Sequence, residues 1–182
     1  MTKAEIEQKL KDTLGAEKII WLPYGIYNDE TNGHIDNICA FTSETDVVLA
    51  WTDDENDPQY KLSSACLKAL ENSTTADGRK ITVHKLPLPK PVLITEHECE
   101  GLDTMDGLPT RTANERLAAS YVNFYISNGA IVMPFFNDQN DEIARDILAS
   151  LFPTREVIGV YARDILIGGG NFHCLTQQIP LS

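Results

Sequence analysis

Three consecutive glycines lie a few residues before a cysteine near the end of the sequence. The stretch reads Gly-Gly-Gly-Asn-Phe-His-Cys-Leu-Thr-Gln-Gln from Gly168 to Gln178, and its cysteine is Cys174. Glycine allows positive φ and lets a ligand or a second backbone segment approach closely. A thiolate is a strong nucleophile. A cysteine on such a turn, among polar side chains, therefore indicates a reactive site, although a buried structural cysteine is the usual fate of this residue type.

A second group of reactive side chains lies in the segment Gly-His-Ile-Asp-Asn, where His34 and Asp36 are two residues apart. We predict a strand over residues 34–41, which would place both side chains on the same face. A histidine can exchange protons near neutral pH, and a carboxylate can hold a cation by charge-assisted hydrogen bonds. On this pattern alone, a structural His–Asp pair is the stronger interpretation.

The composition limits the partners of the protein. The 182 residues carry a net charge of −12, with a pI of about 4.6 and 42% hydrophobic residues. This charge repels nucleic acid and anionic membrane surfaces and attracts small cations, so we expect neither nucleic acid nor a membrane as partner. No apolar run approaches the ~18 to 20 residues of a membrane span, and the first residues lack the apolar core of a signal peptide. The four cysteines and four histidines lack zinc-site spacing, so no metal is expected, and the expected location is a reducing cytoplasm.

Hydrophobic periodicity and turn residues predict helices and strands in a repeating order. Thr2 and Glu5 form a predicted capping box, and Asp57 with Pro58 forms a predicted helix start. The expected helices cover residues 2–14, 58–70 and 138–151, and the expected strands cover 18–23, 34–41, 46–52, 80–86, 117–126, 130–135, 156–161 and 164–167. Residues 92–118 are expected to form an irregular connector.

The order of these elements is an internal repeat of a ββαβ unit. Two complete units and parts of two others fit the chain, about two and a half units of an α/β fold in one domain over residues 1–182. Because the chain starts with the last half of a unit, we expect an incomplete array with an exposed edge, through which two copies could associate.

The sequence strongly resembles the agmatine deiminases of the guanidine-modifying, or pentein, superfamily. The resemblance is carried by residues 33–37, 51–60, 118–125 and 168–178 and extends along essentially the whole chain. It implies a five-bladed α/β propeller, of which this chain would be the C-terminal half. The missing half of the family's fold would supply a further carboxylate and an aromatic wall for the guanidinium group.

The resemblance also implies the chemistry. Agmatine would be hydrolysed to N-carbamoylputrescine and ammonia, a step of polyamine and putrescine synthesis, without metal or organic cofactor. Cys174 would attack the guanidinium carbon to form a covalent amidino intermediate. His34 would be the general acid and base, and Asp36 would bind the guanidinium nitrogens.

Several interpretations stay open beside this one. Asp29 and Glu30 could close over the site and bind substrate, whereas His173 is expected to point away from Cys174 if the segment is extended. The chain could be a non-catalytic fragment or interaction module that needs its missing half. Within the enzymes, an arginine or peptidyl-arginine deiminase is the alternative, and a Cys-His metal hydrolase would require stoichiometric zinc.

Overall fold

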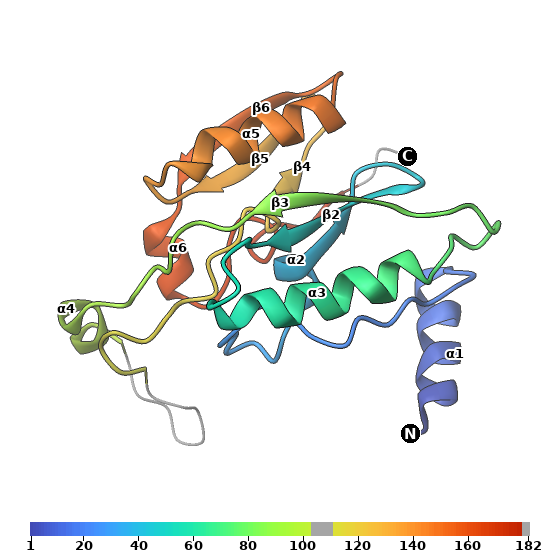
Figure 1. Ribbon diagram of the computed structural model, residues 1–182, viewed down its shortest axis with the longest axis horizontal. Coiled ribbons are helices and arrows are strands. Elements are labelled where there is room, and N and C mark those ends of the chain that lie inside the picture. The colour runs from blue at the N-terminus through green and yellow to red at the C-terminus, as the bar shows by residue number, and fades with distance from the viewer. Residues whose placement is uncertain (103–110, 180–182) are drawn as a thin grey trace.

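Two small sheets of identical topology form the centre of the molecule. The computed structural model describes residues 1–102 and 111–179 (Figure 1). In the first sheet, β1 (Cys39–Phe41) pairs antiparallel with β2 (Asp46–Trp51), and β2 pairs in parallel with β3 (Thr82–Pro87). Helix α3 (Pro58–Glu71) connects β2 to β3.

The second sheet repeats this arrangement. Its strands are β4 (Tyr125–Ile126), β5 (Ala130–Phe135) and β6 (Glu156–Tyr161), in that order, and α5 (Asn140–Leu151) connects the parallel pair β5 and β6. Figure 1 shows α3 and α5 each lying along the sheet of its own unit. The predicted ββαβ repeat is therefore confirmed as two mixed three-stranded units of an α/β fold.

One hydrophobic core joins the two units. On β2, the side chains of Val47, Val48 and Leu49 are all fully buried, because this central strand has a neighbour on both edges and cover on both faces. From the second unit, Ile131 of β5 and Leu148 of α5 enter the same core. Burial of these apolar side chains is the main force that holds the two sheets together.

The N-terminal helix lies at the periphery. Helix α1 (Lys3–Leu14) begins with the predicted capping box between Thr2 and Glu5 and ends at Gly15, which has a φ of 66°. It contains no buried residue. A 2.6 Å hydrogen bond from Trp21 Nε1 to Glu7 ties it to the following segment.

Several sequence predictions about local structure are wrong. Residues 18–23 form no strand, and of residues 117–126 only Tyr125–Ile126 are in a strand. The strand predicted over 164–167 is helix α6 (Arg163–Ile167), because a short apolar run fits a strand or a buried helical turn equally well. The connector contains the short helix α4 (Glu96–Glu100), and its residues 103–110 lie outside the described residues.

The largest correction concerns the Gly-His-Ile-Asp-Asn segment. Residues Ile35–Ile38 form a single helical turn, α2, and strand β1 starts only at Cys39. His34 is the N-cap of this turn, with φ −57° and ψ 140°. His34 and Asp36 therefore do not lie on one face of a strand.

No helix in the described ranges is long and apolar enough to cross a membrane.

Candidate active site

The nucleophile loop, residues 168–178, follows directly after α6. Gly169 has a φ of 93° and lies against the carboxylate of Glu30, where a Cβ would collide with it. A Cβ on Gly170 would lie 2.8 Å from the Cβ of Cys174 and 3.0 Å from its sulfur. Side chains are therefore excluded at both positions, and the glycine run folds the loop so that Cys174 is exposed above it.

The structure brings Cys174 together with Asp36 of α2. The sulfur of Cys174 donates to Asp36 Oδ2 at 3.1 Å, across 138 positions of sequence. The same carboxylate oxygen lies 2.8 Å from Nδ1 of His173. The expectation that His173 points away from the site is wrong, because the loop turns instead of running extended.

Asp36 is held as a carboxylate. Burial alone would raise its pKa, but hydrogen bonds from Cys174 and His173, with the positive charge of His173 and His34, bring the pKa below its ordinary value. Its second oxygen, Oδ1, is buried and has no hydrogen-bond partner in the described part of the chain. Buried acceptors without a partner are rare in proteins, so this oxygen is a distinctive feature of the site.

The Cys174 thiol is held in its protonated form. Burial raises its pKa, and the hydrogen bond and negative charge of Asp36 act in the same direction. A backbone N–H of Asn171 and the amide of Asn123 oppose this rise. The pKa of Cys174 is therefore above the ordinary value, and a cation placed beside Asp36 would reverse the largest charge effect.

His34 lies at the edge of this group. It is exposed at the start of α2 and makes no side-chain cap bond. Its charge reaches Asp36 and lowers the pKa of that carboxyl group.

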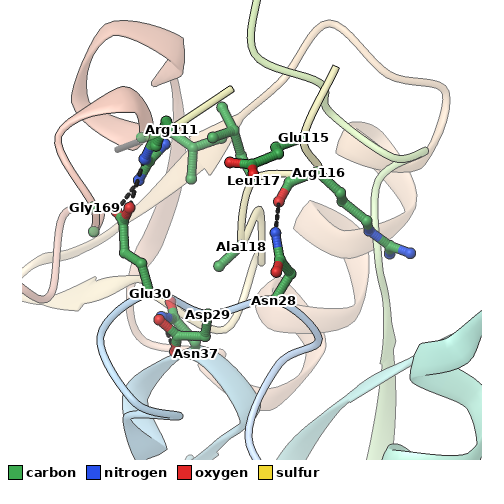
Figure 2. Close-up of a pocket in the computed structure, with 12 residues that line it drawn as sticks. Asn28, Asp29, Glu30, Asn37, Arg111, Glu115, Arg116, Leu117, Ala118 and Gly169 are labelled. Carbon is green, nitrogen blue, oxygen red and sulfur yellow. Dashed lines mark hydrogen bonds and ion pairs between the residues drawn. The ribbon is translucent and has the colours of Figure 1, made fainter. Parts of the chain in front are cut away.

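A pocket lies beside the nucleophile loop (Figure 2) and has a volume of about 210 Å³. Asp29 and Glu30 both line it, together with Gly169 and Gly170. Asp29 accepts hydrogen bonds from Thr31 and from the amide of Asn37, and Glu30 forms an ion pair with Arg111. The acidic side chains of this pocket are thus already engaged within the protein.

Sequence reasoning missed two residues of the site, Asn123 and Arg111. Asn123 lies in a run of aromatic and apolar residues that indicates only core, and its amide is 3.2 Å from the sulfur of Cys174. Arg111 lies in the predicted connector, where no periodicity indicates which side chains turn inward. In both cases only the tertiary structure identifies the residue, because its contact partners, Cys174 and Glu30, are distant in sequence.

The thiol of Cys174, the carboxylate of Asp36 and the imidazole of His173 meet here from segments that flank the two ββαβ units, and this set of groups is suited to nucleophilic chemistry. Residues 1–180 match the family of Porphyromonas-type peptidyl-arginine deiminases, and the chain belongs to this family.

Within the family, several similar proteins carry the name agmatine deiminase. The chain is 59% identical over 180 residues to a Latilactobacillus sakei protein named "Putative agmatine deiminase", a match of 99% of this chain and 49% of that protein. The solved agmatine deiminase of Enterococcus faecalis superposes with a TM-score of 0.93 at 38% identity, over 99% of this chain and 49% of that one. A C. jejuni agmatine deiminase with substrate bound gives a TM-score of 0.75 at 31% identity, over 95% of this chain and 45% of that one. The chain spans about half the length of the curated relatives it matches.

Proposed function

We propose that this chain carries the nucleophile side of an agmatine deiminase site, which hydrolyses agmatine to N-carbamoylputrescine and ammonia in polyamine and putrescine synthesis. The observation that carries the proposal is the contact between the sulfur of Cys174 and the carboxylate of Asp36. The names of the relatives supply the substrate, and the acidic charge of the chain suits a cation.

Asp36 is the proposed anchor for the guanidinium group. Its covered Oδ1 has no partner among the described residues, and a planar N–H donor could pair with it beside Cys174 once the covering atoms move aside. The arriving positive charge would offset the repulsion between Asp36 and a thiolate. The cationic substrate itself would therefore promote the loss of the thiol proton that the empty site retains.

The proposed reaction has two halves. The Cys174 thiolate attacks the guanidinium carbon and forms a C–S bond, and the C–N bond then breaks as ammonia leaves with a proton from His34. In the second half, His34 removes a proton from water, and the resulting hydroxide attacks the same carbon. The C–S bond then breaks to return the thiolate, and the new hydroxyl group loses its proton to solvent as the carbonyl of the product forms. The exposed position of His34 beside α2 supports this exchange of protons with water.

Asp29 and Glu30 are proposed to contribute to substrate binding through the pocket beside the nucleophile loop. The internal bonds of Asp29 keep its carboxylate fixed, and Arg111 balances the charge of Glu30. These residues would therefore add a polar wall rather than a second free anion. The four free cysteines of the chain support a reducing, cytoplasmic location.

The two ββαβ units are proposed to be two blades of a five-bladed α/β propeller, with residues 1–182 as one domain. Among the described residues, β1 has a sheet neighbour on the side of β2 alone, so its other edge is open. An apolar groove of about 690 Å³ lies beside this edge, and Phe41 and Ile35 are 54% and 57% exposed there. We propose this groove as the surface through which the chain associates with a second copy.

The proposed site is tested by comparing two reagents that differ in charge, 2-chloroacetamidine and its neutral analogue 2-chloroacetamide. Each loses chloride as a thioether forms. Because Asp36 lies 3.1 Å from the sulfur, Cys174 should react faster with the cation, by about tenfold after correction for the rates with a small free thiol. Agmatine should protect Cys174, and the adduct measured by peptide mass spectrometry should vanish in Cys174→Ala. Equal corrected rates, or an adduct that persists in that variant, would refute the proposal.

A further inference from the structure

The side chain of Asn123 occupies the centre of a hydrogen-bond network beneath the nucleophile. It is completely buried, at the entrance to the second ββαβ unit. Its Oδ1 accepts from the backbone N–H of His173 at 2.9 Å and from that of Cys174 at 3.4 Å. Its Nδ2 donates to the sulfur of Cys174 at 3.2 Å and to Oδ1 of Asn37 at 2.9 Å. All four hydrogen-bonding positions of the amide are thus used.

The partners fix the orientation of this amide. Two backbone N–H donors face one end, so that end must be the oxygen. The nitrogen then faces the sulfur and the Asn37 oxygen, both of which can accept. Only a carboxamide can hold the loop backbone and direct a donor at the sulfur at the same time.

The network connects three distant parts of the chain. Asn37 belongs to α2 beside Asp36 and donates to Asp29 Oδ2 at 3.3 Å. Asn123 therefore links the side chain of Asn37 to both the backbone and the sulfur of the nucleophile loop. Asp36 and Asn123 contact the sulfur with opposite effects, because a carboxylate repels a thiolate and an N–H donor stabilises it.

We propose that Asn123 is a positioning residue for Cys174: its amide oxygen holds the loop backbone in place, and its amide N–H supports the sulfur when the thiol proton leaves. Charge-assisted hydrogen bonds are roughly twice as strong as neutral ones. The bond to the sulfur therefore strengthens as the thiolate forms. This role deepens the proposed deiminase function and rests on Cys174 as its nucleophile.

The test measures the pH dependence of Cys174 alkylation by iodoacetamide in the full 182-residue chain, with peptide mass spectrometry as readout. Asn123→Asp keeps the oxygen that holds the loop and loses the donor, and Asn123→Leu loses both but fills the volume and excludes water. In each variant the midpoint should rise by about one pH unit or more. For Asn123→Leu, which adds no charge near the sulfur, a purely structural role predicts the opposite, because a loosened loop exposes the thiol and lowers its midpoint toward the ordinary value of ~8.5.

Asn140→Asp is the matched control, because its Nδ2 donates to the Leu88 carbonyl at 2.7 Å and not to the nucleophile loop. Its Cys174 midpoint should equal that of the parent. Thermal unfolding establishes that each variant is folded, and if Asn123→Asp unfolds, Asn123→Leu provides the measurement. An unchanged or lower midpoint in a folded Asn123 variant would overturn the proposal. The experiment uses neither agmatine nor turnover, so such a result would leave the proposed function standing. Conversely, a chain that fails the amidine test could still show the rise of the Cys174 alkylation midpoint in the Asn123 variants.

Discussion

Replacing Asp36 with asparagine should make Cys174 more reactive toward a neutral reagent, although Asp36 is the proposed substrate anchor. The carboxylate lies 3.1 Å from the sulfur and acts with burial to raise the pKa of Cys174. Cys174 is exposed but the Asp36 side chain is mostly covered, so the dielectric constant of water, about 80, gives the smallest repulsion between thiolate and carboxylate, which is about 1.3 kcal/mol or about one pKa unit. Asp36→Asn should therefore lower the alkylation midpoint of Cys174 by about one pH unit.

The assay follows the rates of alkylation by 2-chloroacetamide and 2-chloroacetamidine as a function of pH. At neutral pH, the neutral reagent should react several-fold to about tenfold faster with Asp36→Asn than with the parent, since a lower thiol pKa gives more thiolate at slightly reduced nucleophilicity. The preference for the cationic reagent should disappear in the same variant. A rise in the neutral rate with little change in the cationic rate cannot come from a general loosening of the loop, which would raise both.

Asp46→Asn is the matched control for this substitution. Asp46 forms a similar pair with a histidine, with its Oδ1 2.8 Å from Nε2 of His84, but it does not contact Cys174. The control should keep the parent's midpoint and its preference for the cation. The electrostatic account fails if Asp36→Asn retains the parent's midpoint, or if it still selects the amidine over the amide.

Two further predictions concern stability and association. Hydrogen bonds from Arg163 at 2.7 and 2.9 Å, with those from Thr95, lower the pKa of Glu98 to about 2. The ionised Glu98 therefore stabilises the fold at pH values above its unfolded pKa of ~4.3. This contribution is lost as the pH falls toward about 2. Glu98→Gln should therefore lower the free energy of unfolding by roughly 1 kcal/mol at neutral pH and by almost nothing near pH ~2. Denaturant unfolding at both pH values measures this difference. An equal decrease at both pH values would contradict the ion-pair account. Phe41→Asp should shift a concentration-dependent dimer toward monomer in light scattering, because it places a charge in the apolar groove beside β1. A parent protein that is monomeric at every concentration would rule out this association.

The repeat could be predicted from the sequence because its signals are local. The turn at Asn128-Gly129, the apolar run of β5 and the periodicity of α5 lie within one continuous stretch, and the predicted bounds of β5 and β6 are the observed ones. Where the apolar run is only a few residues long, as in α6, the same residues fit a strand or one helical turn. Propensity could not decide between them, because the choice depends on Leu166 entering a small cluster formed by distant residues.

The candidate site was predictable only in its residue types. The strand proposed for His34 and Asp36 is wrong, yet Asp36 contacts Cys174, because a helical turn at the start of β1 carries it toward the loop. Asn123 could not be found in this way. Its neighbours Val122 and Phe124 are core residues, and nothing local distinguishes an amide that caps a distant loop from one that satisfies its own backbone.

The reactivity of Cys174 is therefore a property of the assembled units rather than of its own segment. The glycines allow the tight turn, but the residues that act on the sulfur are Asp36 from the first unit and Asn123 from the second. One raises the thiol pKa and the other lowers it, and both effects depend on distances of about 3 Å that only the packed core maintains. Under the proposed function, a guanidinium group beside Asp36 would act on the same two opposing effects, and substrate recognition and nucleophile activation would then share one set of contacts.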